Sequence, residues 1–481
     1  MAKKKKSNKV MKFISLIVFI ALIVCLSILS YMIIQANLLP LKYELIIFGV
    51  LLAFVLFFSI FIFKKKINVI ALIIIDILSI GIIGGSIYII PKFDEAIDFL
   101  KNNLSIQFVT NVYNVITSKS SNINSIKDLE GKNIYIYKDD NNDDLVKELN
   151  KKVSNYKLVE VEDLSKLFSD VIKDNNKIII VSQGYYDETI LEDNTYEDKT
   201  KIIDTIEYKT IVKKSESNKN ITEEPFVIYL SGIDTRSGKL PSRSLSDVNI
   251  VLAVNPKTKK VLMINIPRDY YVQLHGTKGL KDKLTHAGTK GGVNLSRQTI
   301  EDLLDIKIDN YIRVNFNAVV NLVDAIGGID VYSDTAFDSY HMKGWHVPKG
   351  TVHMDGKKAL AYSRERYAYR TGDNHRGQNQ EDVITAIINK ISSSKSIASN
   401  YNKILKSLDG TFETDISYDN ISSLIKMQLN DMAKWTTETC NLTGEGKMTV
   451  TYSYPNRNLW VMIPNEKSIA TAKNKLNDFL K

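Results

Sequence analysis

The chain has 481 residues, 44% of them hydrophobic, and a formal net charge of +9, which suits a membrane anchor followed by two or three folded units. The first 66 residues hold ten lysines and one glutamate, so they carry the whole +9 and leave residues 67–481 neutral. This distribution argues against nucleic-acid binding by the folded part, although a basic protein invites that interpretation. The two cysteines, Cys25 and Cys440, exclude a disulfide framework and a CxxC metal site.

Three apolar runs open the sequence, at residues 13–34, 45–63 and 67–90. Each is long enough, or nearly so, to cross the hydrocarbon core of a membrane as a helix. Lysine clusters precede the first run and separate the second from the third. The positive-inside rule then predicts a multi-pass, three-span anchor over residues 1–92, with a cytoplasmic N-terminus and everything after Pro91 outside the cell. Asp76, inside the third run, is expected to serve helix packing or to lie at the membrane interface.

Residues 93–219 predict a small α/β accessory domain. Apolar runs at 133–137 and 177–181 are typical of buried strands, whereas 96–100 and 164–172 are typical of helices. The phrase SIKDLEGKNIYIY resembles the helix-turn-strand entry of a solute-binding-protein lobe. No catalytic constellation stands out in this region, and the polar stretch KKSESNKNITEEP that follows it predicts a linker.

A second α/β domain is predicted to begin at Pro225, with its core over residues 225–395. Its expected strands are 226–233, 248–254, 261–266, 311–314 and 329–332, and its expected helices are 295–304, 316–326 and 382–391. In the last helix, apolar residues from Val383 to Ile391 recur at helical spacing, so this stripe faces the core or lines an apolar cavity. Residues 396–481 are expected to pack on this domain. Their expected elements are helices at 404–408 and 421–432 and a strand at 448–454.

Arginine is distributed unevenly. The chain has ten arginines among 63 basic residues; none precedes Arg236, and nine lie between Arg236 and Arg376. Arginine offers a planar, permanently charged fork that suits phosphate or carboxylate, whereas lysine is a point charge. The clustering therefore points to an anionic ligand, with a chance group of surface ion pairs as the alternative.

Four segments place charged residues at the ends of predicted strands or helices. Asp234 follows the first strand of the second domain, Asp247 precedes the next strand, and Arg268 and Asp269 follow another. The fourth segment, ALAYSRERYAYRTGDNHRGQNQ at 359–380, contributes Arg364, Arg366, Asp373, Arg376 and Gln380. Ligands of open α/β sheets bind where strands end, so these residues are expected to gather at one site.

The residue types at these ends suggest a chemistry. Two aspartates without cysteine or suitably spaced histidine point to a hard cation, Mg²⁺ or Mn²⁺, and the arginines to a pyrophosphate. Arg364 and Arg366 would point the same way, with Glu365 opposite, if their segment is extended; on a helix they would diverge by about 200°. No Walker-type glycine loop and no GxSxG elbow is present. His341, His346 and His353 are interpreted as ordinary loop histidines.

The same segments resemble the LytR–CpsA–Psr family. The resemblance covers about residues 225–391 and rests on INIPRDYYV, KLTHAGTKGGVN, DNYIRVNFNAVVNLVDAIGGIDV, GTVHMDGKKALAYSRER and GDNHRGQNQ, in that order. The three spans and the intervening region resemble the capsule-operon type of member, with an accessory domain ahead of the catalytic one. The resemblance implies an α/β catalytic domain with a central mixed sheet flanked by helices.

The resemblance also implies an activity. It implies a membrane-anchored phosphotransferase that moves a glycopolymer, here taken as capsular polysaccharide, from undecaprenyl pyrophosphate to peptidoglycan, and that could work with other capsule-assembly proteins. Asp234 and Asp247 would hold Mg²⁺. Arg268, Arg364, Arg366 and Arg376 would bind the phosphates, with Gln380 near the head group, and an apolar tunnel would hold the prenyl chain. The catalytic set would be Arg268, Arg364, Arg366, Asp269 and Asp373; either aspartate would orient an arginine or accept a proton, or simply form an ion pair.

Two departures from the family pattern bear on the site. Leu245 stands where the pattern keeps an arginine two residues before Asp247, and Arg243 lies four residues before it. Arg243 is nevertheless predicted to contact the pyrophosphate. Asn379 stands where the tail pattern has a second arginine. Two other functions remain open. A prenyl-pyrophosphate pyrophosphatase would use the same residues, with water in place of the acceptor hydroxyl. A non-enzymatic protein would sense envelope-polymer synthesis without catalysing a reaction.

Overall fold

The computed structural model describes residues 2–64, 69–105, 108–140, 142–211, 215, 217, 219–235, 240–392, 404, 407 and 410–481. The chain forms two compact units, Met1–Ser105 with Tyr418–Ala433, and Ile106–Ser417 with Lys434–Lys481. Arg236, residues 67–68 of the third apolar run and most of the predicted helix at 404–408 lie outside the described residues.

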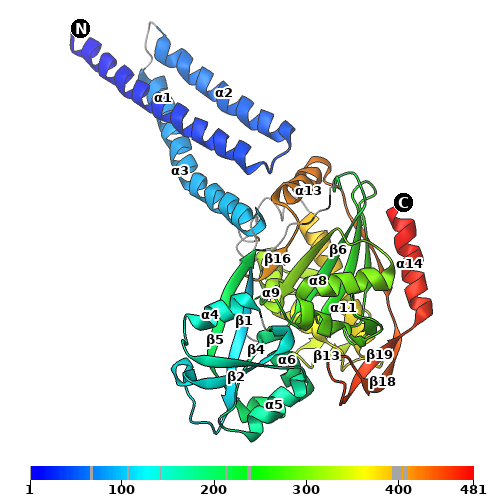
Figure 1. Cartoon of the computed structure of the whole chain (residues 1–481). Coiled ribbons are helices and arrows are strands. Elements are labelled where there is room, and N and C mark those ends of the chain that lie inside the picture. The colour runs from blue at the N-terminus through cyan, green and yellow to red at the C-terminus, as the bar shows by residue number, and fades with distance from the viewer. Residues whose placement is uncertain are drawn as a thin grey trace. The chain divides into compact units, whose positions relative to one another are not determined.

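The smaller unit contains helices α1 (Ala2–Ala36), α2 (Leu41–Phe63) and α3 (Val69–Ser105), drawn in blue in Figure 1. Among the described residues, the stretches Val10–Ala36, Leu41–Phe63 and Val69–Pro91 are long and apolar enough to cross a membrane. Many of their isoleucines, leucines and phenylalanines are exposed, which suits helices surrounded by lipid. The three predicted spans are therefore helices that suit a membrane anchor. The predicted helix at 96–100 is the end of α3.

Polar contacts also hold this unit together. Ser15 Oγ of α1 donates to Asp76 Oδ2 of α3 at 2.7 Å, so the intramembrane aspartate serves helix packing. Helix α13 (Tyr418–Asp431) belongs to the same unit. Its last turn accepts hydrogen bonds from Lys42 and Tyr43 at the start of α2. These hydrogen bonds attach α13 to the start of α2.

A five-stranded mixed sheet forms the first part of the larger unit, in the order β3-β2-β4-β1-β5. The strands are β1 (Phe108–Ser118), β2 (Lys132–Tyr137), β3 (Tyr156–Val161), β4 (Ile178–Ser182) and β5 (Thr200–Ile211). The helices are α4 (Asp143–Asn150), α5 (Leu164–Lys173), α6 (Gln183–Glu192) and α7 (Thr195–Lys199), with 3₁₀ turns η1 (Ile126–Leu129) and η2 (Lys138–Asp140). Two apolar cores, one with α4 and one with α5, cover its two faces, which is why β4 is buried throughout and apolar up to Ser182.

A six-stranded mixed sheet forms the second part, in the order β16-β11-β6-β7-β8-β17. Its strands are β6 (Phe226–Ile233), β7 (Val248–Asn255), β8 (Lys260–Asn265), β11 (Asn310–Asn315), β16 (Phe412–Thr414) and β17 (Thr436–Asn441). β6, β7 and β8 form an antiparallel meander, whereas β11 and β17 pair in parallel with β6 and β8. The edge strands β16 and β17 come from beyond residue 395, so the predicted core range 225–395 leaves out part of this sheet.

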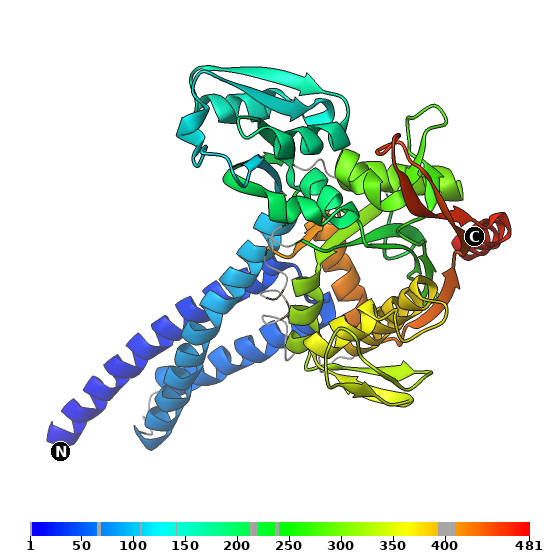
Figure 2. The same ribbon diagram turned by 90° about the horizontal axis from the view of Figure 1, so that it is seen from below.

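Helices flank the six-stranded sheet. α8 (Leu284–Leu304) and α14 (Glu466–Leu480) share the core on one face, and α11 (Asp373–Ser392), α9 (Phe316–Ala325) and α10 (Gly356–Arg364) build a separate core with β12 (Ile329–Ser333) and β15 (Gly350–Met354). These groups are the green-to-yellow and red elements of Figure 2. Val383 and Ala386 of α11 are buried in this second core, so the predicted apolar stripe faces a core. Short pairs complete the unit: β9 (Tyr271–Gln273) with β10 (Lys281–Lys283), β13 (Phe337–Asp338) with β14 (His346–Val347), and β18 (Gly444–Val450) with β19 (Asn458–Pro464).

The predicted strand at 448–454 is wrong in its second half. β18 ends at Val450, and backbone hydrogen bonds between Thr451 and Tyr454 close a turn there. The cause is a distant partner, because the backbone N–H and the hydroxyl of Ser453 both donate to the buried carboxylate of Asp282. A local apolar pattern carries no information about such a contact.

The predicted helix at 295–304 lies in the second part of α8, and a separate helical segment that begins at Leu284 precedes it. The two parts meet at a kink, where Gly291 and Gly292 have non-helical backbone angles and Gly292 has a φ of 64°. A Cβ atom at Gly292 would come 2.6 Å from the carbonyl oxygen of Ser242. Glycine is therefore required there both for the left-handed backbone and for the close approach of the segment that leads to β7.

Candidate active site

Charged side chains gather at one edge of the six-stranded sheet. Because β6, β7 and β8 are antiparallel neighbours, the end of β6, the start of β7 and the end of β8 lie side by side. Asp234, Asp247 and Arg268 occupy these three positions. The backbone N–H of Asp247 donates to the carbonyl of Gly232 at 2.8 Å, which fixes the start of β7 against the end of β6. The predicted gathering of strand-end residues is what the topology produces.

A hollow of about 240 Å³ opens at this edge. Its lining brings together the following predicted site residues: Asp234, Asp247, Arg268, Arg364, Arg366, Arg376 and Gln380. Phe316 and His341 line it as well. Four arginines around two aspartates make a site with positive charge in excess, which suits a dianionic or more highly charged ligand such as a pyrophosphate.

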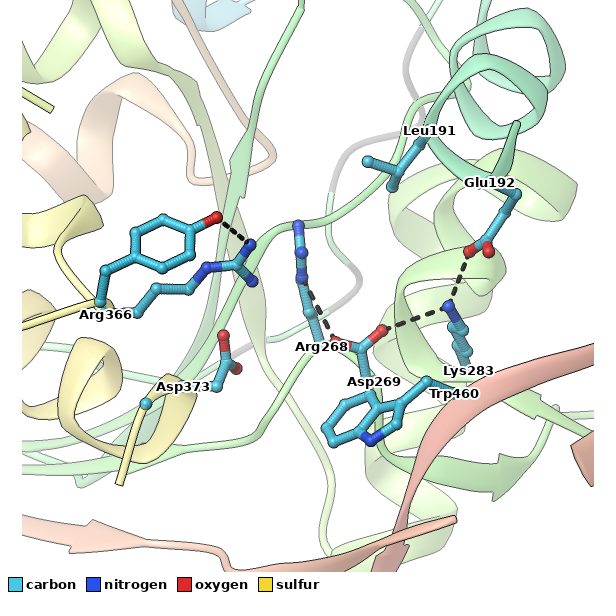
Figure 3. Close-up of a pocket in the computed structure, with 10 residues that line it drawn as sticks. Leu191, Glu192, Arg268, Asp269, Lys283, Arg366, Asp373 and Trp460 are labelled. Carbon is cyan, nitrogen blue, oxygen red and sulfur yellow. Dashed lines mark hydrogen bonds and ion pairs between the residues drawn. The ribbon is translucent and has the colours of Figure 1, made fainter. Parts of the chain in front are cut away.

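A second, larger hollow of about 500 Å³ adjoins the first, since the lining of both includes Leu191, Arg268, Arg366 and Tyr367. Its other lining residues are Glu192, Asp269, Lys283, Gly372, Asp373 and Trp460 (Figure 3). The two predicted catalytic aspartates thus lie in the larger hollow, and the two predicted metal ligands lie in the smaller one.

Arg364 and Arg366 reach the smaller hollow together because the chain is extended between them. Helix α10 ends at Arg364, and Glu365 has φ −66° and ψ 129°. The Glu365 side chain is fully buried, where it accepts the backbone N–H groups of Arg366, Tyr367 and Tyr340. The extended arrangement, rather than the helical one, is therefore what places two guanidinium groups on the same side.

Ion pairs hold the arginines in place. Arg268 donates to Asp247 Oδ1 at 2.9 Å, Arg376 lies 2.8 Å from Asp373 Oδ1, and Arg364 lies 3.7 Å from Asp234. Burial opposes ionisation of Asp247, but the charges of Arg268 and Arg376 outweigh it and hold the pKa of Asp247 below its ordinary value. Asp247 is therefore a carboxylate at neutral pH and can serve as a ligand or as an ion-pair acceptor.

Among the described residues, no group of three or more histidine, cysteine, aspartate or glutamate side chains is placed to hold a metal ion. Asp234 and Asp247 nevertheless line one hollow together with four arginines, whose side chains suit phosphate binding. Mg²⁺ is commonly held by one or two carboxylates, with phosphate oxygens and waters as its remaining ligands. The two-carboxylate donor set fits that mode and does not fit a closed protein cage.

Comparison with known proteins identifies the family. The model of the LytR_cpsA_psr family matches residues 190–478, more than half of the chain. The chain belongs to the LytR–CpsA–Psr family. The polyisoprenyl-teichoic acid–peptidoglycan teichoic acid transferase TagU of Enterococcus faecalis is 36% identical over 250 residues, which cover 51% of this chain and 77% of the relative. Biofilm regulatory protein A of Streptococcus mutans is 38% identical over 238 residues, covering 47% of this chain and 58% of that protein.

Solved structures are also similar to about half of this family member. The crystal structure of Bacillus subtilis TagV is 31% identical with a TM-score of 0.44, over 54% of this chain and 98% of TagV. TagT bound to LIIa-WTA is 27% identical with a TM-score of 0.45, over 56% of this chain and 96% of that structure. Residues 105–210 match a different family model, described as NMT1/THI5 like. That second match covers the five-stranded sheet, where the sequence resembles a solute-binding-protein lobe.

One predicted phosphate ligand lies elsewhere in this LytR–CpsA–Psr protein. Arg243 donates from NH1 to Asp140 Oδ1 at 3.0 Å, and Asp140 is fully buried beside the five-stranded sheet. Its guanidinium group therefore connects the two parts of the larger unit and is not in the described lining of either hollow, so its contact with the pyrophosphate stays a prediction. Leu245, which replaces the family arginine, is buried.

Asn379 is also explained by packing. Its side chain is fully buried, and its amide donates to the carbonyl of Tyr362 at 3.0 Å and to the hydroxyl of Tyr369 at 3.3 Å. These bonds tie α11 to the end of α10. Asn379 therefore supports the arginine segment from behind and does not replace a phosphate contact of the family tail pattern.

Several residues that line the hollows were not predicted as site residues from the sequence. His341 lines the smaller hollow, although it was interpreted as a loop histidine; burial, helped by the positive charge of Arg364, lowers its pKa. Lys283 lies in the KLTHAGTKGGVN block, so the family resemblance offered a signal for it. Glu192 and Trp460 lie outside every quoted motif, and their positions depend on the tertiary structure alone.

Proposed function

We propose that this protein transfers a glycopolymer from an undecaprenyl-pyrophosphate carrier to peptidoglycan. The observation that carries the proposal is the smaller hollow, where four arginines and two aspartates from separate segments surround one space. Such a site suits a pyrophosphate between a prenyl chain and a sugar. Membership of the LytR–CpsA–Psr family and the relatives named as teichoic acid transferases support the transfer reaction over simple binding.

The arginines supply the charge that the reaction needs. Arg268, Arg364, Arg366 and Arg376 would bind the phosphate oxygens and stabilise the negative charge that develops on the leaving phosphate. Asp234 and Asp247 would hold Mg²⁺, which when bound neutralises charge on the pyrophosphate. Gln380, which accepts a hydrogen bond from Asn265 Nδ2 at 3.2 Å, can still donate to a phosphate oxygen.

The transfer step balances as an exchange of one P–O bond for another. A peptidoglycan hydroxyl attacks the sugar-side phosphorus, its new P–O bond forms as the anhydride P–O bond breaks, and undecaprenyl phosphate leaves. Asp269 would accept the hydroxyl proton. Asp373 is held by Arg376 at 2.8 Å, which suits a positioning role, whereas Asp269 lies 3.5 Å from both Arg268 Nε and Lys283 Nζ and is held less tightly.

The polymer we propose is a capsular polysaccharide, because a three-span anchor and most of an extra α/β region precede the part that matches the family. The names of several relatives make teichoic acid the competing donor. The test presents the full chain in vesicles with each lipid-linked polymer, with and without peptidoglycan, and measures polymer bound to peptidoglycan. Capsular polymer on peptidoglycan supports the proposal. Transfer of teichoic acid alone overturns the choice of donor, free polymer in both cases indicates a pyrophosphatase, and unchanged donor indicates a sensor.

A further inference from the structure

The larger hollow has a chemistry that the phosphate-binding role leaves unused. Two aromatic rings line it, and both are accessible, since Trp460 is 43% and Tyr367 57% exposed. Three carboxylates also line it, those of Glu192, Asp269 and Asp373. Arg268, Arg366 and Lys283 in the same lining balance these three carboxylates, so the hollow has no excess of positive charge that would favour a second phosphate. An apolar prenyl chain would not be stabilised by so many charged groups. A flat aromatic face next to several hydrogen-bond acceptors suits a ligand with apolar C–H faces and many hydroxyl groups.

Two elements outside the six-stranded sheet complete this hollow. Leu191 and Glu192 are the last residues of α6, in the part of the chain that carries the five-stranded sheet. Trp460 belongs to β19 of the C-terminal hairpin. The hairpin is fixed beside the site because the backbone N–H of Met462 donates to the carbonyl of Asp269 at 2.8 Å. The indole consequently lies near Asp269 and Lys283, as Figure 3 shows.

A chain of charges connects α6 to the catalytic arginine. Lys283 Nζ lies 2.6 Å from Glu192 Oε1 and 3.5 Å from Asp269 Oδ1, and Asp269 Oδ2 lies 3.5 Å from Arg268 Nε (Figure 3). Burial opposes ionisation of Glu192, but contact with His286 and the charge of Lys283 prevail and lower the pKa of Glu192 to about 2. Glu192 is therefore a fixed negative charge in the wall of the hollow at any physiological pH.

A buried cluster of polar side chains behind the wall of the larger hollow holds α6 against α8. Thr289 of α8 donates to Glu188 of α6, and His286 of α8 contacts Asp282 at 2.7 Å, Glu188 at 3.8 Å and Glu192 at 3.8 Å. Glu188, Asp282 and His286 are fully buried. The end of α6 is thus held against the site by specific contacts, as a ligand-binding wall requires.

We propose that the larger hollow is a saccharide subsite, in which the indole of Trp460 stacks on a sugar ring and Glu192, positioned with Lys283, accepts hydrogen bonds from its hydroxyl or amide groups. The inference rests on the proposed transfer function and extends it to the region before residue 225, which supplies part of the wall. Two sources of saccharide share this chemistry: the first sugar of the lipid-linked donor and the glycan of the peptidoglycan acceptor.

Tryptophan fluorescence of the full chain in detergent or vesicles tests the subsite directly. The probes are an N-acetylglucosamine oligosaccharide, a polyprenyl pyrophosphate that carries one N-acetylhexosamine, and the same lipid without a sugar. We expect a saccharide probe to change the emission of the wild type, and this change to disappear in Trp460→Phe. Glu192→Gln should weaken saccharide binding about tenfold, which corresponds to one lost charge-assisted hydrogen bond. Tyr332→Ala, an exposed aromatic of β12 away from the described lining, should bind like the wild type.

The outcomes separate the subsite from the proposed reaction. A response to the oligosaccharide assigns the hollow to the acceptor, and a response only to the sugar-bearing lipid assigns it to the donor; either supports a saccharide subsite. No response to either saccharide, or an equal response in Trp460→Phe, overturns it. A parallel transfer assay distinguishes the two failures. Transfer by the wild type, with KM values for donor and acceptor that both stay unchanged in Trp460→Ala, contradicts the subsite alone, whereas no transfer by the wild type contradicts the proposed function.

Discussion

The two sheets of the larger unit are both mixed α/β sheets with helices on two faces, yet their strand ends are used differently. In the six-stranded sheet the ends of β6 and β8 open into the hollows. In the five-stranded sheet the ends of the parallel strands β2 and β4 meet at Asp140, whose carboxylate accepts the backbone N–H of Ser182 at 2.6 Å and the guanidinium of Arg243. These strand ends are therefore occupied by Arg243, which comes from the loop before β7.

Under the proposed function, the same architecture would serve catalysis in the six-stranded sheet and structural support in the five-stranded sheet. The region up to residue 211 contains no arginine, so it has no guanidinium fork of its own for a phosphate. A Cβ at Gly184, in the first turn of α6, would come 2.9 Å from the carbonyl oxygen of Arg243, so the two parts pack closely. The part of the chain that carries the five-stranded sheet reaches the site at the end of α6, through Leu191 and Glu192.

The largest effect is expected at the arginines that line the smaller hollow. Replacing Arg364 by alanine removes one of the four guanidinium groups around the pyrophosphate, and transfer should fall by about 10²–10³-fold, as for loss of a single transition-state donor. The assay follows polymer bound to peptidoglycan by the full chain. Arg370→Ala is the matched control, because Arg370 is exposed and lies outside the described lining of both hollows. Equal losses in both variants would mean that general positive charge, not the hollow, supports the reaction.

The next effect concerns the proposed ion. Asp247→Asn keeps the size of the side chain but removes the negative charge, so the Mg²⁺ concentration needed for half-maximal transfer should rise by at least the roughly 10- to 100-fold typical of outer-shell partners. The measurement is a Mg²⁺ titration after removal of divalent ions with EDTA. Asp269→Asn should lower the rate with the Mg²⁺ requirement unchanged. If EDTA leaves wild-type transfer intact, the assignment of Asp234 and Asp247 to a metal is wrong.

A smaller effect, on stability, is expected at the ion pair between Arg243 and Asp140. Arg243→Ala leaves the fully buried Asp140 without its guanidinium partner, and the free energy of unfolding should fall by about 1–3 kcal/mol. Urea unfolding of the purified full chain measures it. The kcat of the folded fraction should stay within about twofold of the wild type, since the phosphate is bound by other arginines. A loss of activity without a loss of stability would restore the predicted phosphate role of Arg243.

A further effect on stability is a dependence on pH. Burial opposes protonation of His286, but the negative charges of Glu188 and Asp282 outweigh it and raise its pKa from 6.5 to about 10. Because the folded value is the higher one, this contribution to stability is complete below about pH 6.5 and is lost progressively as the pH rises to 10. Thermal unfolding between pH 6 and 10 should show this slope, reduced in His286→Gln. The same slope in both proteins would exclude His286 as its source.

The sequence predicts those features that depend on local patterns. The strands β6, β7, β8 and β11 lie within one residue of their expected ends, because buried strands require continuous apolar runs. The clustering of Asp234, Asp247 and Arg268 also follows from sequence, since adjacent antiparallel strands bring their ends together. The three membrane-spanning helices follow from length and hydropathy.

The remainder depends on partners that are far away in the chain. The ion pair of Arg243 could not be predicted from the sequence, because its partner Asp140 lies 103 residues earlier. The direction of Arg366 depends on the burial of Glu365, which a backbone N–H of a distant loop, at Tyr340, helps to stabilise. Trp460 and Glu192 approach the site through a hairpin contact and a helix-helix contact, and neither contact leaves a periodic signal in the sequence.

The most direct test of the central claim follows one phosphorus atom. The full chain in vesicles receives undecaprenyl-pyrophosphate-linked polymer with a radioactive label only on the sugar-side phosphorus, together with peptidoglycan. The account predicts that the label becomes covalently attached to peptidoglycan together with the polymer, and that Arg364→Ala slows this attachment by about 10²–10³-fold. Label that remains on the lipid, or that appears only on free polymer phosphate in the presence of peptidoglycan, would contradict the account.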